Sequence, residues 1–160
     1  MNTEIRNWPH FAMEMVSILM LLCCFIPLVN YGKLAGVEVP SHFDATGAVD
    51  GTSNASIFIF LPCMALAIFA LLTVAEKHPK MVNAPKKLSS NGKEWLDANN
   101  WKFVRELKLC MTGLFTYIIW SMYAVATGKA AEVQLWGFTL FIALTIAVTL
   151  RFYYLLYNHN

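Results

Sequence analysis

Residues 37–51 hold the side chains of this chain that are best suited to chemistry. His42, Asp44 and Asp50 place one imidazole and two carboxylates within nine residues. In a compact loop these groups offer nitrogen and oxygen ligands for zinc or another divalent ion. The same three side chains also suit general acid–base catalysis. In a purely structural alternative, His42 bonds a loop carbonyl and the two aspartates cap their turns.

The neighbouring residues predict that this loop is ordered. Pro40 restricts the backbone ahead of His42, and Phe43 can pack the loop onto the ends of helices. Gly47 and the pair Asp50-Gly51 are turn signals. We therefore expect residues 37–51 to be ordered and packed on the bundle, and a specific binding surface is a further alternative. Its candidate binding residues are Pro40, His42, Phe43, Asp44, Gly47 and Asp50.

Long apolar runs make up most of the remaining chain. Hydrophobic residues account for 58% of the 160 residues and charged residues for 14%, against roughly 25% charged residues in soluble proteins. A helix needs about 20 residues to cross a bilayer. Four runs approach that length, namely residues 11–31, 57–75, 109–127 and 135–154. Backbone groups in lipid must be satisfied within their own segment, so each run is predicted to be a helix.

The charges between these runs predict how the chain is oriented. Residues 76–108 carry eight basic residues, which are Lys77, Lys80, Lys86, Lys87, Lys93, Lys102, Arg105 and Lys108. Residues 32–56 carry Lys33 against Glu38, Asp44 and Asp50. Because basic loops stay in the cytoplasm, the outer loop is 32–56 and the cytoplasmic loop is 76–108. Arg6 and Arg151 fall on the same cytoplasmic side in this orientation, so both termini are expected in the cytoplasm.

The cytoplasmic loop contains a further predicted helix. Asn91 is its expected N-cap, and Leu96, Phe103 and Val104 fall on one stripe at about 100° per residue. We expect this amphipathic helix to lie on the inner membrane surface. The chain is thus predicted to be an all-α membrane protein, with a four-helix transmembrane bundle, an ordered extracytoplasmic loop and an amphipathic cytoplasmic helix. Residues 1–160 form one membrane domain.

Polar groups inside the spans are few. Only Glu14 and Arg151 carry charge there, and both lie near the cytoplasmic end. Ion-coupled transporters need ionisable groups deeper in the bilayer, so we do not expect one. The four cysteines lack metal-ligand spacing, and no disulfide is expected. Tyr123 is expected to anchor the outer interface.

The loop motif resembles that of a known family. The pattern V/I-P-x-H-F-x-x-x-G-x-x-D is typical of the SdpI-type immunity proteins of bacteria, and an Asn-x-Pro follows their second span. The matching loop residues are Val39, Pro40, His42, Phe43, Gly47 and Asp50. Asn83 and Pro85 match the second motif as structural residues. The resemblance implies a short, stand-alone relative in the bacterial cytoplasmic (inner) membrane.

Two functions from different classes follow. The first is a non-enzymatic protein that gives immunity to a secreted, membrane-active peptide toxin through the 37–51 loop, as the resemblance implies. The second is a membrane-embedded enzyme that acts on lipid or cell-envelope substrates with a divalent metal such as zinc, held by His42, Asp44 and Asp50. The first needs no cofactor. The expected partners are the lipid bilayer, a peptide toxin or another membrane subunit, and the net charge of +2 gives no indication of nucleic acid.

Overall fold

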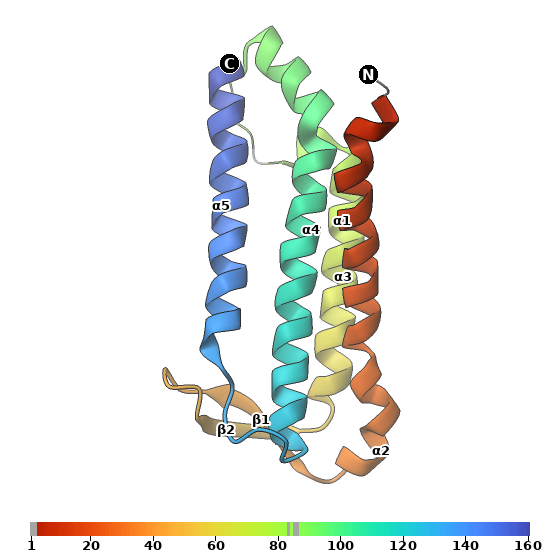
Figure 1. Ribbon diagram of the computed structural model, residues 1–160, viewed down its shortest axis with the longest axis vertical. Helices are drawn as coiled ribbons and strands as arrows, with labels where there is room; N and C mark the ends of the chain where they lie inside the picture. The colour runs from red at the N-terminus through yellow and green to blue at the C-terminus, as the bar shows by residue number, and fades with distance from the viewer. Residues whose placement is uncertain (1–2, 83, 85–86) are drawn as a thin grey trace.

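Four long helices run side by side in the computed structural model of the protein, which describes residues 3–82, 84 and 87–160, with residues 3–6 described by their backbone alone. The elements in chain order are α1 (Thr3–Cys24), the 3-10 helix η1 (Ile26–Asn30), α2 (Tyr31–Leu34), β1 (Glu38–Phe43), β2 (Val49–Asn54), α3 (Ile57–Lys77), the 3-10 helix η2 (Pro79–Met81), α4 (Ser90–Ala126) and α5 (Leu135–His159). Both chain termini lie at one end of the bundle, here called the termini end (Figure 1). The two strands and α2 lie at the other end, here called the hairpin end.

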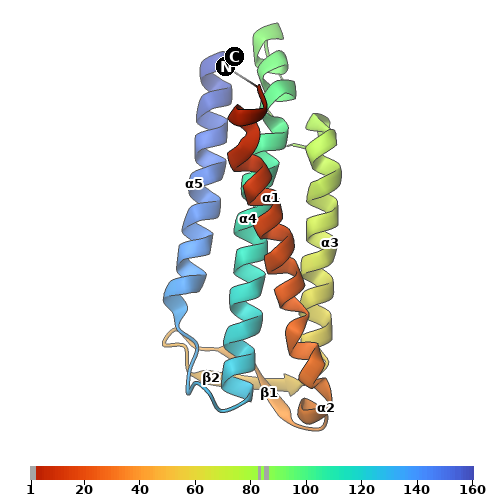
Figure 2. The ribbon, with the colours of Figure 1, turned by 45° about the vertical axis from the view of Figure 1, so that its right-hand side comes forward.

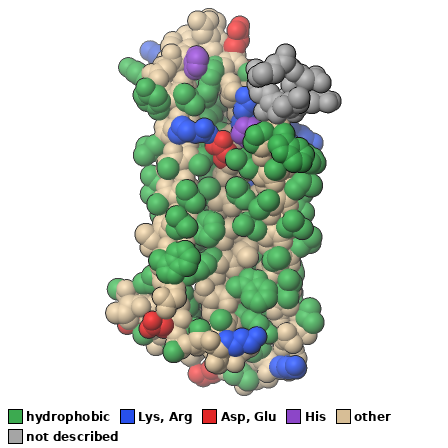
Figure 3. Space-filling model, in the orientation of Figure 1, with side chains coloured by type: hydrophobic (Ala, Val, Ile, Leu, Met, Phe, Trp, Pro, Cys, Tyr) green, Lys and Arg blue, Asp and Glu red, His purple; other side chains and the backbone are tan. Residues whose placement is uncertain are grey.

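The predicted four-span architecture is confirmed at the level of helix length and composition. Four stretches of helix are long and apolar enough to cross a membrane: Asn7–Leu34, Ile57–Lys77, Ser90–Ala126 and Leu135–His159. Hydrophobic side chains cover the middle of the molecule, and charged side chains gather toward its two ends (Figure 3). This is the surface that a bilayer-spanning bundle requires.

The first span is not one uninterrupted α-helix. α1 ends at Cys24, and the chain continues through η1 and the short α2. Pro27 lies in the first turn of η1 and is buried. Proline has no backbone N–H and its ring clashes with the preceding helical turn, which accounts for the change of helix type.

The cytoplasmic part of the chain differs from the prediction. α4 is one helix of 37 residues, and its first turns rise beyond the end of α3 (Figure 2). Its N-cap is Ser89, whose hydroxyl accepts a hydrogen bond from the backbone N–H of Gly92 at 3.0 Å, and Asn91 lies inside the helix. No proline interrupts α4, so the expected separate surface helix is simply its beginning.

The apolar stripe of that segment exists, but it faces other helices. Leu96, Phe103 and Val104 pack in one cluster with Phe152 and Leu156 of α5. The rings of Phe103 and Phe152 stack with their centroids 4.0 Å apart. The stripe therefore builds a core at the termini end, and the expectation that it faces the membrane surface is corrected.

α4 is the central helix and packs against α1, α3 and α5. Its contact with α1 includes a bond from the Thr116 hydroxyl to the carbonyl oxygen of Met20 at 3.1 Å. A second apolar cluster lies at the hairpin end and contains Phe58, Ile119 and Tyr123. Tyr123 is 8% exposed, and its hydroxyl accepts a hydrogen bond from Asn30 at 2.9 Å. It is a core residue and not the interface anchor that was expected.

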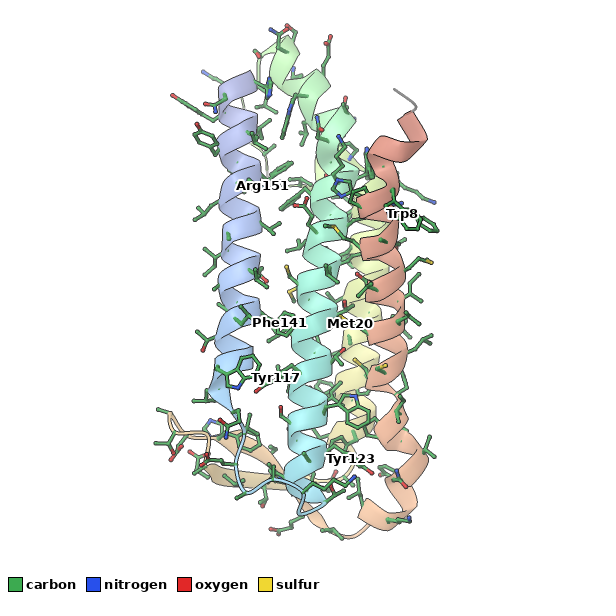
Figure 4. All side chains as sticks on the ribbon, viewed as in Figure 1. Trp8, Met20, Tyr117, Tyr123, Phe141 and Arg151 are labelled. Carbon is green, nitrogen blue, oxygen red and sulfur yellow. The ribbon has the colours of Figure 1, made fainter. Side chains whose placement is uncertain are left out.

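Two glycines allow α4 and α5 to approach each other. A methyl group at Gly113 of α4 would lie 2.3 Å from the ring of Phe141, and one at Gly137 of α5 would lie 2.4 Å from the ring of Tyr117. Tyr117 and Phe141 lie between the two helices (Figure 4). Each helix thus offers a glycine that receives an aromatic ring of the other, as small residues do at membrane helix interfaces.

We expect Gly113→Ala to lower the free energy of unfolding in detergent by about 1–3 kcal/mol, because the methyl group overpacks the contact with Phe141. The double variant Gly113→Ala/Phe141→Leu should recover much of that loss. Gly32→Ala, where the new methyl meets no atom within 4 Å, is the matched control. Equal unfolding midpoints for Gly113→Ala and Gly32→Ala would contradict this account of the helix contact.

Candidate ligand-binding site at the hairpin end

The predicted outer loop contains a two-stranded antiparallel sheet, so the chain is not entirely α-helical. β1 and β2 pair in the register Val39↔Ser53, Pro40↔Thr52, His42↔Gly51 and Phe43↔Val49, with irregularities on both sides of His42. Both strands of such a sheet are edge strands, where the missing N–H of Pro40 is tolerated. Val39 and Pro40 are buried, and Phe43 packs against the apolar cluster of the hairpin end. The prediction of an ordered loop agrees with this hairpin.

Asp44 organises the turn that joins the two strands. Its Oδ1 accepts hydrogen bonds from the Thr46 hydroxyl at 2.6 Å, the Thr46 backbone N–H at 2.7 Å and the Ala48 backbone N–H at 3.1 Å. These bonds, with that of the Thr46 side chain the largest cause, hold the pKa of the Asp44 carboxyl below its usual range. Asp44 therefore fills the role of the structural alternative, that of a turn cap.

Gly47 fastens the hairpin to the loop between α4 and α5. Its φ is +90°, and a methyl group there would lie 2.0 Å from the carbonyl oxygen of Val133. The carbonyl oxygen of Gly47 accepts a hydrogen bond from the backbone N–H of Val133 at 3.0 Å. The predicted turn role of Gly47 is confirmed, and the structure adds a packing role that the sequence did not indicate.

His42 and Asp50 form a pair on the surface of the hairpin. The His42 Nδ1 lies 2.5 Å from the Asp50 Oδ1, and the two side chains are 74% and 43% exposed. Gly51 stands opposite His42, and a methyl group there would lie 3.0 Å from the His42 Cβ. Asp50-Gly51 thus lies within β2, where the glycine leaves room for the imidazole, and is not the turn that was expected.

The three candidate metal ligands are not brought together. Oδ1 of Asp44 is committed to its turn, while His42 and Asp50 pair with each other. Over the described part of the chain, no group of three or more His, Cys, Asp or Glu side chains is placed to hold a metal ion. Asn83 and Pro85, the two structural candidates, lie outside the described residues.

A cavity of about 250 Å³ lies between the hairpin and the ends of α4 and α5. Its walls include Ser41, His42 and Phe43 of β1, Tyr117 and Met122 of α4, and Leu135 and Phe138 of α5. The walls are mainly apolar, and Ser41, His42 and Tyr117 are the wall residues with polar side chains. Concave, mainly apolar walls with a few polar groups are typical of ligand sites.

Comparisons with family models, with curated proteins and with solved structures find no match to this chain. The site is therefore interpreted from its own geometry.

Sequence reasoning missed a second polar site, a buried ionic cluster at the termini end. Nζ of Lys108, whose side chain is 0% exposed, lies 2.8 Å from Oε1 of Glu14 and 2.8 Å from Oε2 of Glu76. Arg105 bonds the other oxygen of Glu76 at 2.8 Å. The cluster joins α1, α3 and α4. Glu14 and Arg151 are thus not the only charged groups in the spans, because Lys108 and Glu76 also lie within spanning helices.

A neighbouring amide supports this cluster. The buried side chain of Asn100 donates to the carbonyl oxygens of Ala75 and Glu76, at 2.8 and 3.2 Å. These carbonyls belong to the last turn of α3, where helical partners are missing. The clue in the sequence was the spacing of Asn100, Arg105 and Lys108 on one helix, but their partners on α1 and α3 are distant in the chain.

The turn bonds predict how Asp44 titrates. We expect its carboxyl to titrate below the range of an aspartate in an unfolded peptide, measured by ¹³C NMR of the side chain. A depressed pKa stabilises the turn at pH values above the unfolded pKa, and this contribution is lost as the pH falls through the folded pKa. Thr46→Ala should move the pKa upward, because it removes the hydroxyl donor. An unchanged pKa in Thr46→Ala would contradict the assigned cause.

Proposed function

We propose that this protein is a bacterial cytoplasmic-membrane protein that protects the cell against a membrane-active toxin by binding it at the hairpin end. The observation that carries the proposal is the mainly apolar cavity of about 250 Å³ beneath the hairpin. An amphipathic toxin at the membrane surface exposes apolar side chains, and this cavity offers them a preformed site. The likeness of the loop motif to that of SdpI-type immunity proteins supports the same function.

The proposal places the hairpin end outside the cell and both termini in the cytoplasm. The basic residues from the end of α3 to the first turns of α4, including Lys77, Lys80 and Lys93, favour the cytoplasm for the termini end. The hairpin carries Glu38, Asp44 and Asp50 without a lysine or arginine. Its charge is that of an extracytoplasmic segment.

The geometry favours binding over the alternative of a metal-dependent envelope enzyme. That enzyme needs Asp44 to join His42 and Asp50 around one ion. Three hydrogen bonds hold Asp44 in its own turn, and among the described residues it forms no group with His42 and Asp50 that could hold a metal ion. The pair His42–Asp50 is better explained as a polar edge to the apolar cavity.

A protection assay tests this function. Bacterial cells that express the full chain are challenged with a panel of secreted membrane-active peptides, and depolarisation of the membrane is followed with a potential-sensitive dye. Cells with the native chain should resist at least one peptide at concentrations that depolarise cells without it. Replacing residues 40–51 by a Gly/Ser segment should abolish the resistance.

A milder variant guards against loss of folding in that replacement. Leu135 lines the cavity, and the larger side chain of Leu135→Trp should fill part of it. This variant should reduce protection, while its unfolding temperature stays equal to that of the native chain. Lys93→Met, an exposed position at the termini end, is the control and should protect fully. Undiminished protection by both the Gly/Ser and Leu135→Trp variants would overturn the proposal.

A further inference from the structure

Three acidic residues neighbour wall residues of the cavity and are here called its rim. Asp44 and Asp50 lie on the hairpin that carries His42 of the cavity wall, and Glu132 directly precedes Val133, another wall residue. All three carboxylate residues are exposed. In Figure 3, acidic side chains lie over the hairpin at the lower left of the molecule. A ligand in the cavity would therefore lie close to residues that carry carboxylates.

The carboxylates of the rim are held in place and remain available. The bonds from Thr46 and Ala48 to the Asp44 carboxylate all end on its Oδ1. Asp50 is oriented by His42, and Glu132 accepts one bond from Gln134 at 3.2 Å. Such fixed but exposed carboxylates can receive lysine or arginine groups of a partner without reorganisation.

The basic residues of this end do not neutralise the rim. Lys33 belongs to α2, which lies on the far side of the hairpin end from α5 and the turn of the hairpin (Figure 1). Lys129 follows the last turn of α4, and within the described residues neither lysine forms an ion pair with a rim carboxylate. Counted with Lys129, the three rim carboxylates leave a formal charge of about −2 when His42 is neutral.

From this juxtaposition we propose that the partner of this site is a cationic amphipathic peptide. One large apolar side chain would occupy the cavity, and lysine or arginine side chains of the same peptide would contact Asp44, Asp50 and Glu132. This inference rests on the proposed function and specifies the ligand class. A cavity of about 250 Å³ is smaller than the roughly 300–1,000 Å³ of sites for drug-sized molecules. It matches one side chain, with the rest of the peptide lying across the acidic rim.

The same charges argue against an anionic phospholipid as the occupant. A phospholipid whose acyl chain filled the cavity would bring its phosphate close to the rim. Like charges that face each other across a contact are unfavourable. A peptide with basic and apolar side chains satisfies both parts of the site.

A binding experiment with two synthetic peptides tests this inference. The full chain is placed in nanodiscs of phosphatidylcholine, and binding is measured by fluorescence anisotropy against empty discs. The probes are a helical peptide of leucine and lysine with one tryptophan, and the counterpart with glutamate in place of lysine. We expect the lysine peptide to bind at least tenfold more tightly than the glutamate peptide. The variant Asp50→Asn/Glu132→Gln should weaken the lysine peptide about tenfold.

Glu38→Gln is the matched control, because Glu38 is an exposed hairpin carboxylate that accepts a bond from Thr52 and pairs with Asn54 at the end of the hairpin away from its turn. It should bind the lysine peptide as the native chain does. Equal binding of the two peptides would overturn the inference that the ligand is cationic. If Leu135→Trp weakened the binding of both peptides, the cavity would still be a binding site. Binding of neither peptide would also overturn the inference, and the protection assay would then judge the proposed function separately. Native mass spectrometry can also detect one phospholipid bound to the native chain and absent from Leu135→Trp. If neither peptide bound in that case, the cavity would be a lipid site and the inference of a peptide ligand would be overturned.

Discussion

Replacing Lys108 by methionine is expected to lower the free energy of unfolding by about 3–5 kcal/mol, the cost of removing one partner from a buried ionic group. The Lys108 side chain is fully buried between the carboxylates of Glu14 and Glu76. Methionine fills a similar volume but leaves both carboxylates facing each other. Burying unpaired charge in a low-dielectric interior is far costlier than burying a pair.

The measurement is unfolding of the purified protein in mixed micelles, followed by tryptophan fluorescence as the fraction of denaturing detergent increases. Lys93→Met is the matched control, because the same substitution on the same helix removes an exposed lysine. The triple variant Glu14→Gln/Glu76→Gln/Lys108→Met should recover part of the loss, since it also removes the charges of the two carboxylates that Lys108 had paired. If Lys108→Met and Lys93→Met unfolded at the same fraction of denaturing detergent, the ionic cluster would not stabilise the packing of α1, α3 and α4.

Gly47→Ala is expected to detach the hairpin from the loop between α4 and α5. The left-handed φ of +90° costs a residue with a side chain about 1–2 kcal/mol. The new methyl would also lie 2.0 Å from the carbonyl oxygen of Val133, so the backbone must move and the bond from the Val133 N–H is lost. We expect a total loss above about 2 kcal/mol of hairpin stability, with loss of protection.

Hydrogen exchange of the Val133 amide measures this detachment. Gly36→Ala separates the two causes, because Gly36 also has a positive φ of 83° but its methyl would meet no atom within 4 Å. Gly32→Ala has neither problem and serves as the reference. Fast exchange at Val133 should appear in Gly47→Ala alone. Slow exchange in all three variants would show that Gly47 does not fasten the hairpin.

The spans could be predicted because the length and hydrophobicity of each apolar run are enough to indicate a membrane-spanning helix. The run from Ile57 was predicted to end at residue 75, and α3 ends at Lys77. The hairpin was harder, because Pro40 is unusual in a strand and Asp50-Gly51 resembles a turn. Only the cross-strand position of Gly51 opposite His42 reveals why a glycine stands there.

The ionic cluster could not be predicted for a different reason. From the sequence, Lys108 was interpreted as one of the basic residues that place the loop in the cytoplasm. That interpretation gave no reason to expect ion-pair partners for it. Its partners, Glu14 and Glu76, are 94 and 32 residues away in the chain. Which charges meet is decided by how α1, α3 and α4 pack. The packing of aromatic rings of α4 and α5 against glycines of the other helix could not be predicted for the same reason. The residues around Gly113 and Phe141 in the sequence do not indicate that these two residues are in contact.

The orientation of the hairpin end is the claim on which the proposed function depends most directly. Ala45→Cys at the exposed turn of the hairpin and Lys93→Cys at the exposed start of α4 are each expressed in intact cells and treated with a membrane-impermeant maleimide. The parent chain, whose four cysteines lie in the spanning helices, gives the background. The account predicts labelling of Ala45→Cys in intact cells and of Lys93→Cys only after the cells are opened. Labelling of Lys93→Cys in intact cells, with Ala45→Cys protected, would contradict the account.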